Sequence, residues 1–175
     1  MDISIVSEDS LRIKGKRASF IVVDPGVSIP KTPADFVVTL NGKKENSLVK
    51  VDGFRVVING AGEYEIGGIK LAAHAFEDDL LYDIAVDGID IILSNSEVIK
   101  KEGEKIKESH IVIVRTDSVV DESSVTAASP RIVALYGKHT QESAKVLGRQ
   151  DLKPVNKISY TLEKLPQEME VVVLG

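Results

Sequence analysis

Short runs of apolar, mostly β-branched residues recur along the chain, and glycine, aspartate and asparagine separate many of them. Runs of this length between turn-forming residues are typical of β-strands, so the chain is predicted to be built mainly from β-sheet. The predicted strands are Ile3–Val6, Leu11–Ile13, Ser19–Val23, Phe36–Leu40, Leu48–Val51, Phe54–Ile58, Tyr64–Ile66, Ile69–Ala73, Leu80–Val86, Ile89–Leu93, Ile111–Val114, Ile132–Leu135, Lys157–Thr161 and Glu170–Leu174.

Turn-forming dipeptides lie between several neighbouring runs. Asp52-Gly53, Gly67-Gly68 and Asp87-Gly88 each separate two apolar runs, and Asn41-Gly42 follows another. Residues of these types readily adopt the positive φ angles that tight hairpin turns need. The first half of the chain is therefore predicted to form antiparallel β-structure.

Helical signals appear in the second half of the chain. Ser94 and Glu97 have the spacing of a capping box, which predicts a helix that runs to about Glu108. Further short helices are predicted at Asp121–Ala128 and Thr140–Gly148, each with its first residue as the N-cap.

The two strands between these helices are apolar throughout. Ile111–Val114 and Ile132–Leu135 have the pattern expected of strands that are covered on both faces. Antiparallel strands followed by alternating strands and helices indicate an α+β fold. We predict a layered sandwich, with two facing mixed sheets and helices on the outer faces, in a single domain that spans residues 1–175.

Composition and charge exclude several classes of function. The chain has no cysteine, so it has neither disulfides nor thiolate ligands. Its net charge is −5 and its basic residues are scattered, so no nucleic-acid partner is expected. We expect no membrane partner and a cytoplasmic location, because no apolar run could span a bilayer and the N-terminus lacks a signal-peptide pattern.

The histidines and carboxylates offer only weak candidates for chemistry. His74, His110 and His139 lie far apart in the sequence, without the close pair that zinc sites usually contain. His110 is interpreted as structural, whereas His74 and His139 remain candidates. Glu63 and Glu65 should point the same way on one strand, and an exposed polar face explains them better than acid–base catalysis.

Several segments, in order along nearly the whole chain, carry a resemblance to a known family. These are Leu11–Ile13, Asp24-Pro25, Ala34–Thr39, Gly62–Gly67, Ile158–Thr161 with Leu165-Pro166, and Glu170–Leu174. Together they resemble the small metallo-β-lactamase superfamily proteins of the ascorbate-phosphate-lactonase-like and phospholipase-D-like branch. The resemblance implies a metallo-β-lactamase-like fold of reduced size.

The metal-binding residues that the resemblance implies are largely missing. The family's His-x-His-x-Asp-His motif falls on Leu40, Gly42, Lys44 and Glu45. Its bridging aspartate falls on Asn95, and its last histidine falls on Gly137, with His139 two residues later. Only His74 matches a ligand position. We therefore expect no metal, no cofactor and no metal-dependent hydrolase activity.

The leading functional hypothesis is a non-catalytic scaffold or interaction protein that binds an unidentified protein partner. A second hypothesis is a module that binds a small anion in the former active-site cleft. A third is a metal-free hydrolase that uses His74 or His139 as a base, oriented by Asp117. A filled cleft favours the first, and a pocket of convergent polar groups favours the second. The candidate cleft residues are Ser7, Asn41, Lys43, Lys44, Asn46, His74, Asn95 and His139.

Overall fold

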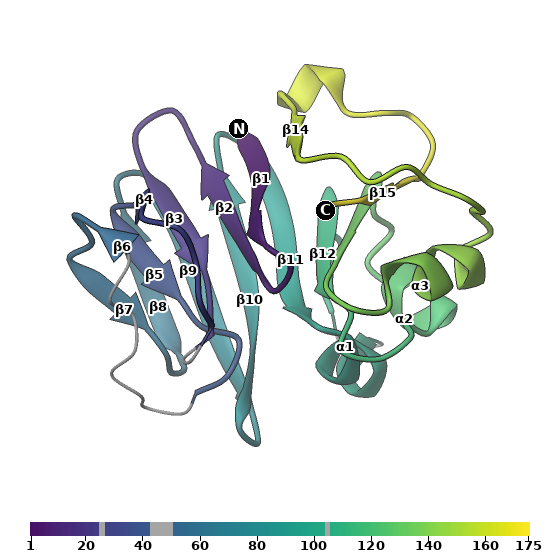
Figure 1. Ribbon diagram of the computed structural model, residues 1–175, viewed down its shortest axis with the longest axis horizontal. Coiled ribbons are helices and arrows are strands. Elements are labelled where there is room, and N and C mark those ends of the chain that lie inside the picture. The colour runs from purple at the N-terminus through teal and green to yellow at the C-terminus, as the bar shows by residue number, and fades with distance from the viewer. Residues whose placement is uncertain (25–26, 43–50, 104–105) are drawn as a thin grey trace.

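Two β-sheets face each other in the computed structural model, which describes residues 1–24, 27–42, 51–103 and 106–175 (Figure 1). The first sheet has six strands, and it mixes antiparallel pairs with two parallel ones. In spatial order they are β14 (Lys157–Ser159), β1 (Asp2–Ser7), β2 (Ser10–Lys14), β3 (Ser19–Val22), β5 (Phe36–Val38) and β7 (Val56–Ile58).

The second sheet has seven strands and changes from antiparallel to parallel across its width. In spatial order they are β15 (Glu170–Val173), β13 (Ile132–Tyr136), β12 (Ile111–Arg115), β11 (Ile89–Asn95), β10 (Asp79–Val86), β9 (Ile69–Phe76) and β8 (Gly62–Ile66). A separate two-stranded ladder joins β4 (Thr32–Pro33) to β6 (Val51–Asp52).

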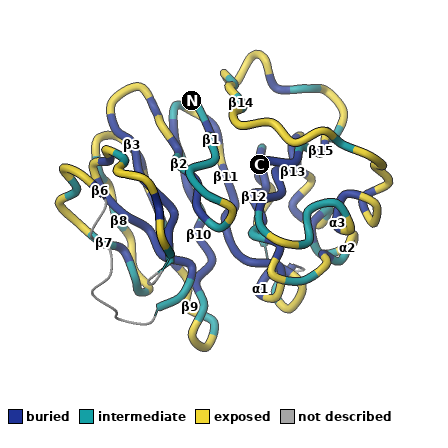
Figure 2. The backbone as a smooth tube through the Cα atoms, viewed as in Figure 1, coloured by how far each residue is buried: buried dark blue, intermediate teal, exposed yellow. Residues whose placement is uncertain are grey.

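The main core lies between the two sheets, where alternate residues of facing strands interdigitate. Phe20 and Phe36 stack with ring centroids 4.8 Å apart on the first sheet. Ile69 and Leu71 of β9 face inwards, while Lys70 between them is exposed. Figure 2 shows the resulting dark band of buried backbone along the central strands. Burial of these apolar side chains supplies most of the favourable free energy of folding.

Three short helices cover part of the outer face of the second sheet: α1 (Ser96–Glu102), α2 (Glu122–Thr126) and α3 (Thr140–Val146). They pack against β12 and β13, where Ile111–Val114 and Ile132–Leu135 are 0–1% exposed. This confirms the layered α+β sandwich and the prediction that both strands are covered on both faces. Of the described residues, no helix is long and apolar enough to cross a membrane.

Among the described residues, no α-helix covers the outer face of the first sheet, where the sequence predicted one. Val23, Ile29, Ala34 and Val51, from loops and from the β4–β6 ladder, pack against Val37 and its neighbours on its outer face. The described helices therefore lie on the second sheet, with a short 3₁₀ turn, η2 (Leu162–Lys164), in the C-terminal segment. A short, twisted sheet of this size can be covered by irregular chain, provided that enough apolar side chains lie on it.

The turn predictions were partly right. Gly67-Gly68 (φ 58° and 82°) and Asp87-Gly88 (φ 52° and 82°) form the expected hairpins β8–β9 and β10–β11. Asp52-Gly53 does not form one, because β6 pairs in parallel with β4 and β7 pairs in parallel with β5. Asn41 forms an isolated bridge with Asp79, and the residues that follow Gly42 lie outside the described residues, so the turn predicted at Asn41-Gly42 stays a prediction. Most of the predicted strand Leu48–Val51 lies outside the described residues.

The predicted helix N-caps were right at Asp121 and wrong elsewhere. Asn95, not Ser94, caps α1, because its amide oxygen accepts a 2.9 Å hydrogen bond from the Val98 backbone N–H. The Ser94 hydroxyl instead donates to the Leu80 carbonyl inside the sheet. His139 takes the N-cap position of α3, without a side-chain bond, and Thr140 is the first helical residue. Helix α1 ends at Glu102, earlier than predicted.

Candidate functional site

The carboxyl ends of three parallel strands meet at one edge of the second sheet. Asn95 of β11 pairs in register with Arg115 of β12, and Arg115 pairs with Tyr136 of β13. The segment after β5 joins the same edge, because the Leu80 N–H donates to the Leu40 carbonyl and the Gly42 N–H to the Asp78 carbonyl. Ligands of open α/β sheets bind beyond the carboxyl ends of such strands. We therefore place the candidate site here.

An ion-pair cluster centred on Arg115 occupies this edge. Its Nη1 donates to the Asp24 carboxylate, while its Nε and Nη2 each contact the Asp117 carboxylate at 2.9 Å. The second oxygen of Asp24 accepts from the backbone N–H groups of Leu40 (2.7 Å) and Asn41 (3.0 Å). One guanidinium thus ties together the segments that follow β3, β5 and β12.

Two members of the cluster are largely shielded from solvent, whereas the Asp117 side chain is 40% exposed. The side chains of Arg115 and Asp24 are 12% and 14% exposed. Burial alone would lower the pKa of the Arg115 guanidinium, but the charges of Asp24 and Asp117 outweigh burial and raise that pKa above its ordinary value. Arg115 is therefore a permanent cation held between two carboxylates.

Two fully buried tyrosines lie beside the cluster and differ in their hydrogen bonding. The Tyr82 hydroxyl donates to the Thr39 carbonyl (2.7 Å). The Tyr136 hydroxyl has no hydrogen-bond partner among the described residues. Burial raises the pKa of both phenols, so both remain neutral. Tyr136 therefore contributes an unpaired buried hydroxyl beside the Arg115 cluster, and the buried Thr39 hydroxyl is also unpaired among the described residues.

The sequence matches no protein-family model and no curated protein. Its structure resembles that of a metallo-β-lactamase superfamily protein from Thermotoga maritima, with TM-score 0.76 and 18% identity over 99% of this chain and 97% of that one. The chain has the metallo-β-lactamase fold. A Parabacteroides distasonis protein described as a metal-dependent hydrolase also has a similar structure. Its TM-score is 0.61 and its identity is 14%, over 99% of this chain and 93% of that one.

A mutant of the Streptomyces venezuelae β-hydroxylase CmlA also shares the fold. It has TM-score 0.59 and 11% identity, over 92% of this chain and 54% of that one. At such low identities, these likenesses establish the architecture of the chain and leave its activity open.

The described residues do not fit the metal centre that the metallo-β-lactamase fold implies. Among residues 1–24, 27–42, 51–103 and 106–175, no three His, Cys, Asp or Glu side chains lie close enough together to hold a metal ion. The guanidinium of Arg115 contacts Asp24, which binds the backbone of Leu40 and Asn41. A fixed cation in that place repels a metal dication and already serves as the counter-charge of Asp24 and Asp117.

Gly137, at the position where the resemblance places the family's last histidine, has a backbone that disfavours a side chain. Its φ of +98° is one that side chains rarely adopt, although an added Cβ would make only ordinary contacts, 3.4 Å from the Thr116 nitrogen and 3.5 Å from Arg115 Cγ. The neighbouring His139 donates its backbone N–H to the Thr116 carbonyl. Asp117 contacts Arg115, so the expectation that Asp117 orients a catalytic histidine is wrong.

The other candidate cleft residues that the structure describes do not form one cluster. His74 points from the outer face of the second sheet, where its Nε2 lies 3.0 Å from the Asp83 carboxylate on β10. Asn95 is 3% exposed and caps α1. Ser7 ends β1 with its hydroxyl buried and unpaired among the described residues. Lys43, Lys44 and Asn46 lie outside the described residues.

Sequence reasoning missed Arg115, although a signal for it was present. An all-apolar strand, Ile111–Val114, ends directly in Arg115, and Asp117 follows two residues later. A charged residue at the carboxyl end of a buried parallel strand lies where ligands bind, so this position alone makes Arg115 a candidate site residue. Asp24 appeared only as part of a family motif, although it is the residue that holds the guanidinium.

Proposed function

We propose that this chain is a non-catalytic protein of the metallo-β-lactamase fold that acts by binding another protein. The observation that carries the proposal is the Arg115 guanidinium, fixed by Asp24 and Asp117 at the edge where the fold's metal ligands would converge. A hydrolase of this fold needs an ion there to bind and activate a water molecule. In this chain the same position holds the chain's own cation and its two counter-charges.

The hypothesis of a small-anion site receives less support from the described residues. Nη1, Nη2 and Nε of Arg115 are all directed at carboxylates, so the cluster offers an anion no preformed guanidinium fork. Attraction of an anion would depend on Lys43 and Lys44, which lie outside the described residues. That hypothesis remains a prediction.

The metal-free hydrolase is also less well supported. His74 does pair with a carboxylate, Asp83, but this pair lies on the outer face of the second sheet, and the His74 side chain is 46% exposed. Within the described residues, no serine or threonine hydroxyl forms a hydrogen bond with His74, whose partner is Asp83. The pair therefore lacks the nucleophile that a base and its orienting acid would activate in covalent catalysis.

Elemental analysis and activity assays test the proposed function together. Protein expressed with added zinc, iron or manganese should contain well below one ion per chain after gel filtration, because the described residues include no set of metal ligands. Lactonase, phosphodiesterase and β-lactam hydrolysis should stay at the level of a buffer blank, with and without added metal. About one tightly bound ion per chain, or turnover that follows the protein through purification, would contradict the proposal.

A further inference from the structure

Half of the outer face of the second sheet is bare in the described part of the chain. The helices cover the side that contains β12 and β13, through an apolar cluster that includes Leu81 and Ile92. Beyond that cluster, the outward residues of β8 and β9 are polar or small, and most are exposed. A helix packs on a sheet through apolar side chains, so a polar sheet face is not a site for helix packing and its pattern needs another explanation.

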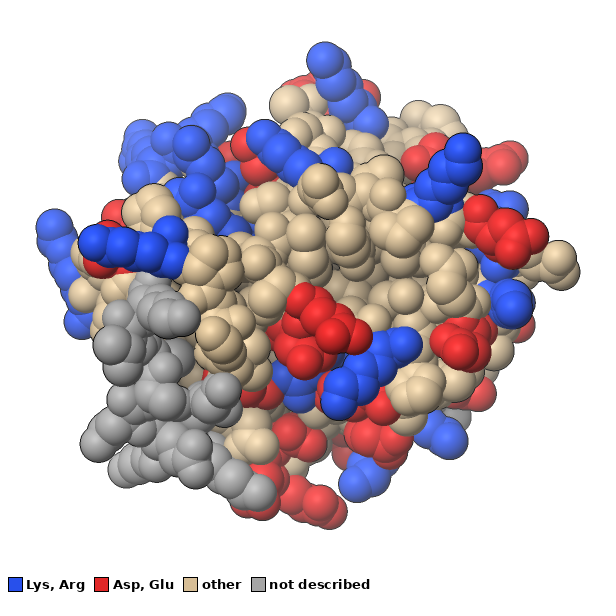
Figure 3. Space-filling model, in the orientation of Figure 1, with Lys and Arg blue, Asp and Glu red and all other residues tan. Residues whose placement is uncertain are grey.

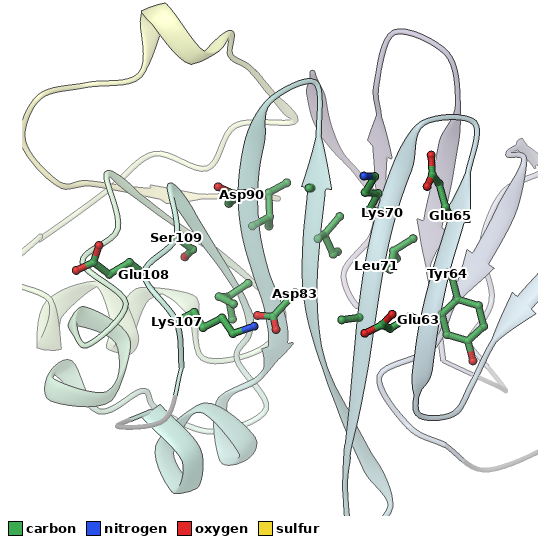
Figure 4. A pocket seen from close by; sticks show the side chains of 15 residues that line it. Glu63, Tyr64, Glu65, Lys70, Leu71, Asp83, Asp90, Lys107, Glu108 and Ser109 are labelled. Atoms are coloured by element: carbon green, nitrogen blue, oxygen red, sulfur yellow. The ribbon is translucent and has the colours of Figure 1, made fainter.

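A shallow groove of about 670 Å³ lies on this bare face (Figure 4). Its lining includes five carboxylates and two lysines, Lys70 and Lys107, over a floor that contains Ala72 and Ala85. The carboxylates are Glu63, Glu65, Asp83, Asp90 and Glu108. The groove is therefore acidic overall, in a chain whose basic residues are largely elsewhere.

The strand register places these charges in two rows across the sheet. In one row Ala72 pairs with both Glu63 and Asp83, so no lysine of β9 separates these two carboxylates. In the other row Lys70 pairs with Glu65 and Ala85, and Ala85 pairs with Asp90. His74 contacts Asp83 from the β9 side. Glu63 is thus the carboxylate with the least compensation on its own sheet.

The groove ends at a free strand edge. Strand β8 is the last strand of its sheet, and no strand of the described residues pairs with its other side. A free edge presents backbone N–H and C=O groups that can pair with an added strand. Glu63 and Glu65 are two residues apart on one face of β8, about 7 Å along the strand.

We propose that an extended basic segment of a protein partner adds to β8 as an eighth strand and places alternate lysine or arginine side chains beside Glu63 and Glu65. The added strand would make backbone hydrogen bonds to β8. Its alternate side chains would share the outer face with the two glutamates, within reach of cross-strand ion pairs. This inference rests on the proposed function, because it names a surface through which an interaction protein would work.

A second copy of the chain is the competing occupant. On the face shown in Figure 3, lysine and arginine gather at the upper left, over the connection between β2 and β3. Lys14, Lys16 and Arg17 are exposed there. This connection is a tight turn rather than an extended segment, so it fits the edge of β8 less well than a free strand would.

The test uses a synthetic peptide of about eight residues in which lysine alternates with valine, its ends acetylated and amidated. Titration calorimetry should show binding that weakens with added salt. A peptide with glutamate in place of lysine should not bind, and neither should one with its lysines gathered at one end. Methylating the backbone nitrogens on the edge-facing side should abolish binding, because those groups pair with β8.

Protein variants assign the contact to the two glutamates. Glu63→Lys/Glu65→Lys should weaken binding of the alternating peptide by on the order of tenfold or more. Glu63→Gln should weaken it more than Glu65→Gln, because Lys70 already compensates Glu65. Glu8→Lys/Glu168→Lys makes the same change of charge at two exposed positions off this face and should leave the affinity unchanged.

Three outcomes would overturn the inference. They are equal binding of the lysine and glutamate peptides, unchanged affinity in Glu63→Lys/Glu65→Lys, or self-association that this variant abolishes. The metal and hydrolysis measurements do not depend on β8, so failure here would leave the proposed function standing. Conversely, a bound catalytic metal would refute the proposed function without affecting the peptide result.

Discussion

Replacing Arg115 with methionine should destabilise the protein strongly, because it leaves a buried carboxylate without its counter-charge. Asp24 is 14% exposed and would keep only its two backbone hydrogen bonds, from Leu40 and Asn41. Removing one partner of a buried ion pair costs about 3–5 kcal/mol. Because those two backbone bonds remain, we expect a loss near the lower limit, about 3 kcal/mol. For a domain of this size, that loss lowers the melting temperature by about 6–12 °C.

The design separates lost charge balance from lost packing. Arg115→Met/Asp24→Asn removes both charges, and the asparagine oxygen can still accept the backbone bonds, so this variant should recover at least half of the lost stability. Urea denaturation followed by far-ultraviolet circular dichroism measures each variant, since the chain has no tryptophan to report by fluorescence. Arg55→Met, at an exposed arginine, is the control and should stay within about 0.5 kcal/mol. A loss below about 1 kcal/mol in Arg115→Met, or no recovery in the double variant, would show that the cluster does not hold the fold as argued.

Two further predictions concern single side chains. Tyr82→Phe should cost about 1 kcal/mol of stability because it removes a buried hydrogen bond to Thr39. Tyr136→Phe should be neutral or stabilising because the Tyr136 hydroxyl is unpaired among the described residues. Equal losses of stability in urea denaturation would contradict this difference. Hydrogen bonds from Lys157 and Ser159 lower the pKa of Asp2 below its ordinary value of 3.8, so the Asp2 carboxylate stabilises the fold above that pH and its contribution is lost on acidification. Asp2→Asn should therefore be less stable than the natural protein at pH 7, and the gap should close below pH 3.8; a gap that is constant with pH would contradict the assignment.

The strands were predictable from the sequence because alternation and turn residues are local signals. The pairs β8–β9 and β10–β11 follow from glycine at positive φ, which only a few residue types tolerate. The pairing of β3, β5 and β7 did not follow, because parallel neighbours are chosen by tertiary packing rather than by the turn between them. The Asp52-Gly53 turn therefore predicted the wrong partner for β7.

The helix boundaries show a related limit. Ser94 and Glu97 have capping-box spacing, yet the Ser94 hydroxyl is committed to Leu80 across the sheet. The cap then falls to Asn95, the next residue with a suitable side chain. Sequence spacing identifies residues that can cap a helix, but a competing hydrogen bond from another element decides which residue does so.

The candidate site was less predictable than the fold because its central contact joins residues far apart in the sequence. Arg115 and Asp24 are 91 residues apart, and neither belongs to a local motif that indicates the other. The resemblance predicted that the family's metal ligands are replaced, but it did not indicate which residues take their place. It also placed His74 at a ligand position, although strand alternation directs the His74 side chain to the outer face of the second sheet.

The Arg115 cluster also bears on where a partner would bind. A buried carboxylate such as Asp24 requires a counter-charge, and an arginine of the same chain supplies one that cannot dissociate, whereas a bound cation can. Each nitrogen of the Arg115 guanidinium contacts a carboxylate, and the side chain is only 12% exposed, so the cluster offers little to a ligand. Glu63, in contrast, is exposed on a free edge strand and has no counter-charge in its own row of the sheet. It pairs with Ala72, which in turn pairs with Asp83. Since an uncompensated charge at a free edge can still gain from a partner, the bare face of the second sheet is the better place to look for one.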